Sequence, residues 1–263
     1  MTLADRTVLL TGATGGLGQA IARRLHRAGA ALTLTGRRID VLEPLAAETG
    51  ARSLVVDLTD GRAVERLAAD CADVDVLVAT AGLPASGHVL SFDVAQIDRA
   101  LDVNLRAPMI LSRLIGERMA ARGEGHIVFL SSMSGKAATP RSAVYSATKF
   151  GLRGYASGLR QDLRPRGVGV SAIFPGFVRE AGMFAESGAK LPPGVGTSTP
   201  AEVADAIVRA IERNRGEVDV APLPMRLGVL FSALAPGVAA TVTRLAGGEA
   251  IGDQFGRGQA SKR

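Results

Sequence analysis

The sequence predicts a single α/β domain in which a parallel sheet is covered by helices on both faces. Short apolar runs alternate with helical patterns along the chain, which is typical of repeated βαβ units. The runs are almost continuously apolar, as expected of parallel strands that helices cover on both sides. The length of 263 residues fits one large α/β unit, and an apolar fraction of 47% supplies a core without metal or disulfide staples.

The expected strands follow the chain at regular intervals. A weaker, edge-like seventh strand is expected at 217–220, where the alternating pattern ends. The six strands with a buried character are expected at 7–10, 32–35, 53–56, 76–79, 127–130 and 170–174.

The expected helices lie between these strands. Leu17, Ile21 and Leu25 form one apolar stripe at helical spacing, and Gly29 marks the end of that first helix. Three further helices are expected over 94–119 with a kink at Pro108, over 145–162 up to Arg164-Pro165, and over 200–213 behind a capping Thr199.

The segment 227–243 departs from this pattern because its seventeen residues carry no charge and are bracketed by Arg226 and Arg244. A helix that spans a membrane needs about 20 apolar residues, and this segment is shorter and contains Pro236. We therefore expect an α/β domain at 1–222 and an apolar C-terminal extension with a basic tail at 223–263. The extension is expected to pack on the domain, on a partner subunit of a homodimer or homotetramer, or, through 227–243, peripherally on a membrane.

Composition argues against several classes of partner. The net charge is +6, and 27 of the 31 basic residues are Arg. Acidic residues are interleaved almost everywhere, aromatic residues make up 4%, and no nucleic-acid-binding motif is present, so no nucleic-acid partner is expected. The three histidines show no spacing typical of metal ligands, so no metal is expected. Cys71 stands alone and no apolar leader precedes the first strand, which favours a cytoplasmic protein.

A glycine-rich turn connects the first expected strand to the first expected helix. Glycines allow a tight turn and a close backbone approach to a pyrophosphate, to which the helix N-terminus offers free N–H groups. Four glycines in seven residues are more than a plain βα turn requires. The sequence therefore predicts a dinucleotide site that includes Gly12, Thr14, Gly15, Gly16, Leu17 and Gly18.

Tyr145 and Lys149 stand at positions i and i+4 of an expected helix and therefore share one face. A free phenol has a pKa of about 10, and a neighbouring cation is expected to lower it. Tyr145 can then move a proton to or from a substrate oxygen. Tyr155, the other tyrosine of the chain, lacks a lysine four residues further on.

Together these motifs resemble the classical short-chain dehydrogenase/reductase family. The resemblance rests on the Thr-Gly-xxx-Gly-x-Gly spacing over 11–18, on the Tyr-xxx-Lys motif, and on Ser132, which stands thirteen residues before Tyr145. It extends along the chain to about Val220. It implies one doubly wound domain of the Rossmann type, with seven parallel strands in the order 3-2-1-4-5-6-7.

The resemblance implies a catalytic set. Ser132, Tyr145 and Lys149 would form a triad in which Ser132 bonds the reacting oxygen and Lys149 also holds the nicotinamide ribose. Ser131 is the alternative serine, but it is offset by one residue and should point to the other side of the strand end. Asn104 matches the fourth catalytic residue of the family, which orders a water in a proton relay through the lysine. The alternative for Asn104 is a local hydrogen bond within its helix.

The resemblance also implies the choice of cofactor. Members that bind NAD place an aspartate at the position of Gly36, whereas here Gly36 is followed by Arg37 and Arg38. A guanidinium grips phosphate through a fork of donors. We therefore expect NADP, with Arg37 as the main contact to its 2′-phosphate. The alternative is that both arginines are solvated surface residues.

Further cofactor contacts are implied by their positions. Thr80 replaces the usual asparagine of the family, although its hydroxyl can make some of the same backbone bonds. Glu180 stands where a threonine often contacts the pyrophosphate, so either Glu180 turns away or Arg179 compensates its charge. The implied contacts are Asp57 and Leu58 at the adenine, Thr80, Ala81 and Gly82 beside the ribose, and Pro175, Gly176 and Val178 at the nicotinamide, in addition to Tyr145 and Lys149.

These expectations describe an NADP-dependent oxidoreductase that transfers a hydride between the nicotinamide and a carbonyl/secondary-alcohol pair. The segment 177–195 is expected to form a mobile, largely apolar lid, so the small-molecule substrate is expected to be an apolar ketone or alcohol. The alternative is a catalytically idle NADP-binding regulatory protein on the same fold. The complete catalytic set argues against that alternative, because a pure binder has no chemical reason to hold it.

Overall fold

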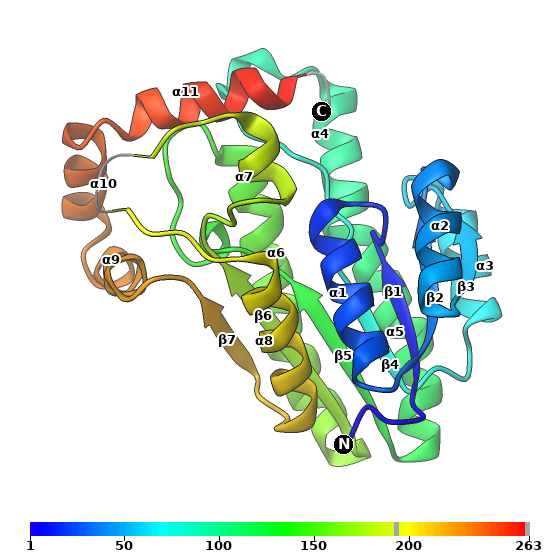
Figure 1. Cartoon of the computed structure of the whole chain (residues 1–263). Helices are drawn as coiled ribbons and strands as arrows, with labels where there is room; N and C mark the ends of the chain where they lie inside the picture. The colour runs from blue at the N-terminus through cyan, green and yellow to red at the C-terminus, as the bar shows by residue number, and fades with distance from the viewer. Residues whose placement is uncertain (192–194, 261–263) are drawn as a thin grey trace.

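The computed structural model describes residues 1–191 and 195–260 of the chain. In this part of the chain seven strands form one sheet, and all neighbouring strands are parallel (Figure 1). The strand order β3-β2-β1-β4-β5-β6-β7 confirms the predicted order. The edge position expected for the seventh strand is also confirmed. The strands are β1 (Thr7–Thr11), β2 (Ala31–Gly36), β3 (Arg52–Val55), β4 (Val76–Ala79), β5 (Gly125–Leu130), β6 (Val168–Pro175) and β7 (Glu217–Val220).

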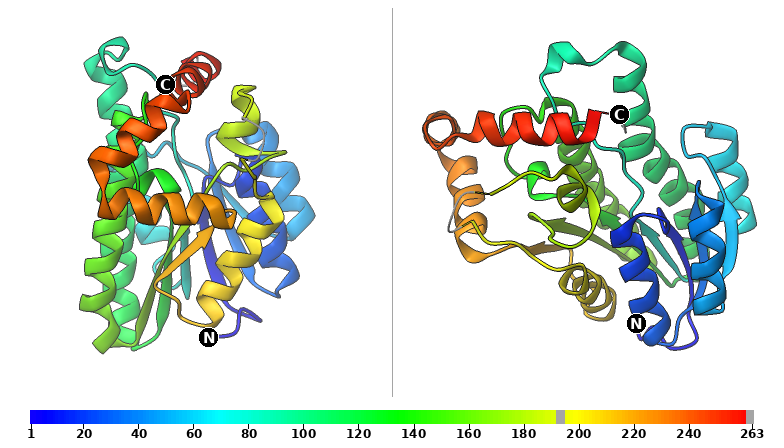
Figure 2. Two further views of the ribbon diagram at one scale, coloured as in Figure 1. Left: turned by 90° about the vertical axis from the view of Figure 1, so that its left-hand side faces the viewer. Right: turned by 45° about the horizontal axis from the view of Figure 1, so that its top comes forward.

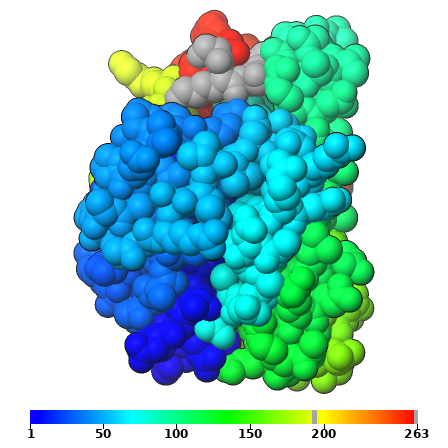
Figure 3. Space-filling view, turned by 90° about the vertical axis from the view of Figure 1, so that its right-hand side faces the viewer, coloured from blue at the N-terminus to red at the C-terminus, as the bar shows by residue number. Residues whose placement is uncertain are grey.

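Helices cover both faces of this sheet, as predicted. Figure 3 shows that segments from the first third of the chain, coloured blue to cyan, build the side of the molecule at the β3 edge. One face is covered by α1 (Gly16–Arg27), α2 (Ile39–Thr49) and α8 (Pro200–Glu212), and the other by α3 (Gly61–Asp70), α5 (Ala107–Arg122) and α6 (Ala143–Leu163).

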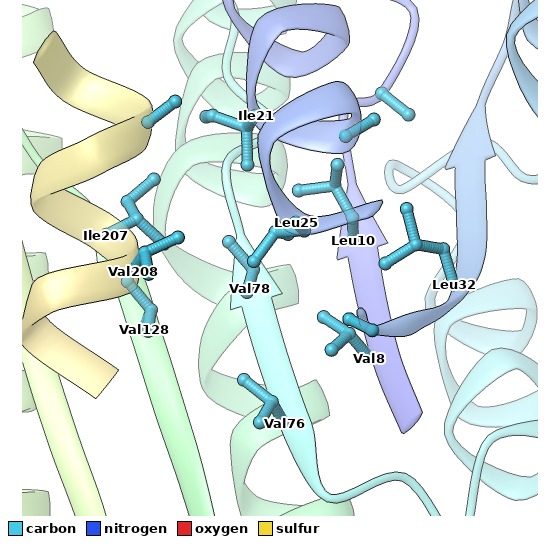
Figure 4. Packing of buried hydrophobic residues seen from close by; sticks show 14 of the residues in the cluster. Val8, Leu10, Ile21, Leu25, Leu32, Val76, Val78, Val128, Ile207 and Val208 are labelled. Atoms are coloured by element: carbon cyan, nitrogen blue, oxygen red, sulfur yellow. The ribbon is translucent and has the colours of Figure 1, made fainter. Parts of the chain in front are cut away.

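Each central strand supplies side chains to both cores, because successive residues of a strand point to opposite faces. Val8 and Leu10 of β1 belong to the cluster beneath α1 and α8, together with Val78 of β4 (Figure 4). Leu9 and Leu77, from the same two strands, belong to the cluster on the opposite face. This division explains why the central strands are almost continuously apolar.

The predicted helix over 94–119 is interrupted earlier than expected. It consists of α4 (Val94–Leu101), a π-helical turn (Asp102–Arg106) and α5 (Ala107–Arg122). Pro108 has no N–H to offer the carbonyl four residues before it, and the chain widens in the preceding turn, where the Ala107 N–H bonds Asp102 O instead. The distortion expected at Pro108 therefore falls in the turn before it, and Pro108 lies in the first turn of α5.

Two other helix boundaries confirm their sequence signals. The Thr199 side chain accepts a hydrogen bond of 3.0 Å from the Glu202 N–H, and the Glu202 carboxylate accepts one of 2.7 Å from the Thr199 N–H. This reciprocal cap starts α8. Helix α6 ends at Leu163, immediately before Arg164-Pro165.

The C-terminal extension forms three helices, α9 (Leu223–Leu234), α10 (Pro236–Leu245) and α11 (Gly248–Gln259). Helix α11 runs across the top of the molecule, above the carboxyl ends of the strands, and packs against the short helix α7 (Gly182–Ser187) (Figures 1 and 2). Residues 192–194 of the predicted lid and 261–263 of the predicted basic tail lie outside the described residues.

The uncharged segment 227–243 does not bury most of its large apolar side chains in its own domain. It spans α9 and α10, and Leu230 and Leu234 remain 58% and 78% exposed. No helix in the described ranges is both long and apolar enough to cross a membrane. We call the exposed surface the α9–α10 apolar face, formed by Leu223, Leu227, Leu230, Phe231, Leu234, Val238, Val242 and Leu245.

Candidate active site

A cavity of about 700 Å³ lies at the carboxyl ends of the parallel strands, where α/β sheets of this kind bind ligands. It is lined by all the predicted cofactor contacts and by three of the four predicted catalytic residues. The exception is Asn104. From the predicted set the cavity wall contains Gly12, Thr14, Gly15, Gly16, Leu17, Gly18, Arg37, Arg38, Asp57, Leu58, Thr80, Ala81, Gly82, Ser132, Tyr145, Lys149, Pro175, Gly176 and Val178.

The glycine-rich turn is held against its neighbours at distances that only glycine allows. Gly12 has φ of 74°, and a Cβ there would lie 2.7 Å from the backbone of Ala81. A Cβ at Gly18 would lie 2.1 Å from the carbonyl oxygen of Gly12. The turn therefore presents its backbone to the cavity, and the first turn of α1 directs its N–H groups there, as a pyrophosphate requires.

The cavity has a basic rather than an acidic group at the end of β2. A Cβ at Gly36 would lie 2.4 Å from Cγ2 of Thr14, so an aspartate has no room there unless Thr14 moves. The Arg38 guanidinium donates a hydrogen bond to the Thr14 carbonyl oxygen. Arg37 is exposed on the cavity wall, and its guanidinium has no hydrogen-bond partner within the described chain. Arg37 is thus free to contact an anionic ligand.

The structure brings Ser132, Tyr145 and Lys149 together in the cavity. The Ser132 hydroxyl lies beside the Tyr145 phenol, close enough to favour its phenolate and so oppose the rise of its pKa. The Lys149 ammonium donates a hydrogen bond of 2.9 Å to the carbonyl oxygen of Leu130. Ser131 bonds away from the phenol, because its hydroxyl donates to the backbone carbonyl of Lys149 at 3.1 Å. Of the two serines, it is Ser132 that contacts the tyrosine.

The charge state of this group differs from the one expected from the sequence. Burial raises the pKa of Tyr145 to about 12, although the neighbouring Ser132 opposes this rise. Burial lowers the pKa of Lys149 to about 8. The expectation that the lysine lowers the pKa of Tyr145 was wrong, because desolvation of the phenolate dominates. At neutral pH Tyr145 holds its proton and can donate it.

Asn104 holds the wall of the cavity together instead of facing it. It is buried in the π-helical turn, where its side-chain oxygen accepts a 2.6 Å hydrogen bond from Leu83 N–H and its amide donates one of 3.0 Å to Leu83 O. The same amide lies 3.4 Å from the Thr148 hydroxyl of α6. Asn104 therefore fixes the segment that follows β4 relative to the catalytic helix. Its role in ordering a water remains a prediction.

Both departures from the family pattern have a structural explanation. The Thr80 hydroxyl donates a 2.6 Å hydrogen bond to the carbonyl oxygen of Thr11, so it ties β4 to the glycine-rich turn. The Arg179 guanidinium donates to the Glu180 carboxylate at 3.0 Å and to the Thr197 hydroxyl at 3.2 Å. Glu180 does not line the cavity. Its charge is therefore both compensated and kept away from the expected diphosphate.

The sequence motifs did not reveal that the chain's last helix reaches the cavity. Gly258 and Gln259 of α11 line it, beside Met183 and Phe184 of α7. A signal was present in the four glycines of α11, at 248, 252, 256 and 258. A Cβ at Gly258 would lie 2.1 Å from the Ser187 carbonyl oxygen, so this glycine marks a close crossing of α11 over α7.

Comparison with known proteins agrees with this arrangement. Residues 6–192 match the family described as short chain dehydrogenase. The ketoacyl reductase HetN of Nostoc sp. is 35% identical over 245 residues, which cover 90% of this chain and 85% of the relative.

Two solved structures extend the comparison. A short-chain dehydrogenase from Sphingobium yanoikuyae in complex with NADPH aligns with a TM-score of 0.77 and 28% identity, covering 89% of this chain and 95% of that one. A bulky-bulky ketone specific alcohol dehydrogenase from Comamonas testosteroni aligns with a TM-score of 0.73 and 27% identity, covering 89% and 94%.

Proposed function

The chain belongs to the short-chain dehydrogenase/reductase family of oxidoreductases, and on that premise we propose that it is an NADP-dependent ketoreductase. The observation that carries the proposal is the convergence of three features on one cavity. These are the glycine-rich turn, the free guanidinium of Arg37, and the neighbouring pair of Ser132 and Tyr145. A turn that binds dinucleotides and a phenol that holds a proton together suit the reduction of a carbonyl group.

The residues of the cavity fit NADPH along its whole length. The glycine-rich turn and the N-terminus of α1 would hold the pyrophosphate, and Arg37 would hold the 2′-phosphate. Thr14 occupies the space that an aspartate at position 36 would need, which supports the preference for NADP over NAD. Sphingobium's enzyme, a structural neighbour, is described with NADPH bound. When bound, the cofactor supplies the hydride.

The side chains of this protein supply the proton and orient the substrate. Ser132 would donate a hydrogen bond to the carbonyl oxygen and hold it beside the Tyr145 hydroxyl. As negative charge develops on that oxygen, Tyr145 would transfer its proton to it. Lys149 would stabilise the resulting phenolate, because its pKa of about 8 keeps most of the ammonium charged at neutral pH. The protonated state of Tyr145 suits the reductive step, in which the phenol donates the proton.

The substrate that we propose is a ketone of moderate size with apolar flanks. Phe184 lines the cavity and packs against Phe177 and Phe255 behind it, with ring centroids 5.2 to 5.8 Å apart, so this part of the wall is apolar. The relatives described as a ketoacyl reductase and as a bulky-ketone dehydrogenase support a carbonyl substrate. The idle regulatory protein stays the alternative, although nothing about binding alone requires Ser132 beside Tyr145.

The test is the oxidation of NADPH by the purified protein in the presence of a ketone panel, with NADH as the comparison. The proposal expects turnover with at least one ketone and a clear preference for NADPH. Tight NADPH binding in calorimetry without turnover on any ketone would favour the idle regulatory protein instead. Equal use of both cofactors would contradict the assignment of Arg37.

A further inference from the structure

Helix α11 forms part of the roof over the cavity. In Figures 1 and 2 it crosses from α10 toward α4 above the strand ends. Asp253 accepts a 2.7 Å hydrogen bond from Arg141, and the Gln254 side chain accepts one of 3.0 Å from the Lys190 N–H. Phe255 adds a contact with Phe184 at 5.6 Å between ring centroids. These contacts fix α11 on the lid segment and bring its last turn to the cavity.

Gln259, in that last turn, carries an unused hydrogen-bond acceptor. The residue is 3% exposed and lies on the cavity wall. Its amide Nε2 donates a 3.0 Å hydrogen bond to the carbonyl oxygen of Met183, which fixes the orientation of the amide. Its Oε1 is buried and has no hydrogen-bond partner. Native structures rarely leave a buried amide oxygen unpaired unless a ligand or water completes it.

The position of Met183 places this acceptor at the reacting end of the cavity. A Cβ built at Gly82 would lie 3.5 Å from Cε of Met183 and 3.8 Å from the Lys149 ammonium, so the Met183 side chain reaches the surroundings of the catalytic lysine. Oε1 of Gln259 carries partial negative charge and would repel the anionic pyrophosphate, so the pyrophosphate is not the partner of this acceptor. The residues around Arg37 and Asp57 form the expected adenosine end of the same cavity. Gln259 therefore serves the substrate or the nicotinamide.

The only other buried side-chain atom without a partner in the described residues is Oγ1 of Thr35, at the end of β2. Thr35 also lines this cavity, beside Arg37 and Arg38. Both residues with an unsatisfied oxygen therefore belong to the wall of one cavity. This coincidence favours a ligand as the missing partner of Gln259 over a local packing defect.

We propose that Oε1 of Gln259 accepts a hydrogen bond from an N–H or O–H donor of the ligand bound at the reacting end, which makes Gln259 a specificity-determining residue contributed by the C-terminal helix. The proposal rests on the proposed ketoreductase function and narrows it. If the donor belongs to the substrate, the preferred ketones carry a hydroxyl or an amide N–H besides the reacting carbonyl. If the donor belongs to the cofactor, it is the carboxamide of the nicotinamide.

The probes for the test are the ketones ethyl acetoacetate and N-ethylacetoacetamide. They differ at one position, where the first has an ester oxygen and the second has an amide N–H that can donate a hydrogen bond. Gln259→Met keeps the length of the side chain and removes the acceptor. Gln254→Met is the matched control, because it loosens α11 without altering a residue on the cavity wall. For each protein we would measure kcat/KM for both ketones with NADPH, the dissociation constant of NADPH, and the dissociation constants of both ketones for the NADP-loaded protein by calorimetry.

A substrate donor predicts that the wild type favours the amide and that Gln259→Met lowers the amide-to-ester ratio by about five- to tenfold, with NADPH affinity unchanged. A carboxamide donor predicts weaker NADPH binding by a similar factor with the ratio unchanged. The proposal is overturned if Gln259→Met changes neither the amide-to-ester ratio nor the affinity for NADPH. It is also overturned if Gln259→Met and Gln254→Met change every measured constant by the same factor, because Gln259 would then only anchor the helix. Absence of turnover in the wild type would contradict the ketoreductase function, while the calorimetric constants would still decide the role of Gln259.

Discussion

Arg37 is the single residue on which the preference for NADP depends. Loss of a charge-assisted bond to phosphate costs about 1.5–3 kcal/mol. We expect Arg37→Ala to weaken NADPH binding by one to two orders of magnitude, roughly, and to leave NADH binding nearly unchanged. Isothermal calorimetry with both cofactors measures this. Arg27→Ala is the control, because Arg27 is an exposed arginine at the end of α1, away from the cavity. A parallel loss for NADH would show that Arg37 does not read the 2′-phosphate.

The pKa values of Tyr145 and Lys149 predict the pH dependence of reduction. Tyr145, with a pKa of about 12, keeps its proton across the accessible range. Lys149, whose pKa burial lowers to about 8, loses its charge as the pH rises through that value. Since kcat/KM reports the groups of the free enzyme, the reductive kcat/KM should be level at pH 6–7 and fall above about pH 8. A profile that rises steadily to pH 10 would contradict these assignments.

Local motifs made most of the candidate site predictable at the level of residues. Gly12 to Gly18, Arg37 and the Tyr145–Lys149 pair each lie within a short segment, so their spacing encodes their chemistry. The pKa of Tyr145 was not predictable, because it depends on how much water the folded cavity excludes. Gln259 was not predictable either, because it reaches the cavity only through the packing of α11 on α7, which no short motif encodes.

At the level of elements, β5 and β6 bury a histidine between them. His126 contacts the Ser171 hydroxyl at 2.8 Å, and burial together with the charge of Arg160 lowers its pKa to about 3. Below a pH of about 6.5 the unfolded chain protonates this histidine while the folded one does not. The stability present at neutral pH is therefore lost as the pH falls from about 6.5 toward 3.

This linkage predicts a difference between the wild type and His126→Gln. When the pH is lowered from 7 to 4, the free energy of unfolding of the wild type should fall by about 3 kcal/mol more than that of the variant. Urea denaturation at both pH values, followed by circular dichroism, measures the difference. Replacement of His88, an exposed histidine, should have no such effect. Identical pH slopes for the wild type and His126→Gln would show that His126 titrates normally.

The strands and the covering helices were predictable because buried parallel strands leave a nearly continuous apolar run. Most observed strands match the predicted ones or extend them by one or two residues, as at β6 (Val168–Pro175), whereas β3 (Arg52–Val55) is shifted by one residue from the predicted 53–56. The π-helical turn before Pro108 was not predictable, because a proline indicates that a helix is distorted but does not fix which turn is distorted. The packing of α9 and α10 was not predictable either. An apolar sequence indicates that a segment tends to be buried, but it does not indicate whether the segment packs on its own domain or on another surface.

The whole molecule exposes the α9–α10 apolar face, and we propose that a second copy of the chain covers it. Exposed apolar patches commonly mark interaction surfaces, and two-fold assemblies are the commonest. Light scattering without detergent should give the mass of a dimer or tetramer, and Leu230→Glu should shift it toward the monomer. Leu90→Glu, at a residue 86% exposed outside this face, is the control.

Two results would contradict the oligomer. A monomer at high concentration would mean that the face stays uncovered. Co-sedimentation of the wild type with anionic vesicles, lost in Leu230→Glu, would assign the face to a membrane surface instead, with Arg226 and Arg244 at the headgroups.

The central claim is that Tyr145 donates the proton in an NADPH-dependent reduction, and the comparison of Tyr145→Phe with Tyr155→Phe tests it most directly. Both variants lose one phenolic hydroxyl, but Tyr155 bonds Ser112 and Met109 outside the cavity. On a ketone that the wild type reduces, Tyr145→Phe should lower turnover by at least about 10²-fold while NADPH affinity is retained, and Tyr155→Phe should remain active. Near-wild-type turnover of Tyr145→Phe would contradict the account.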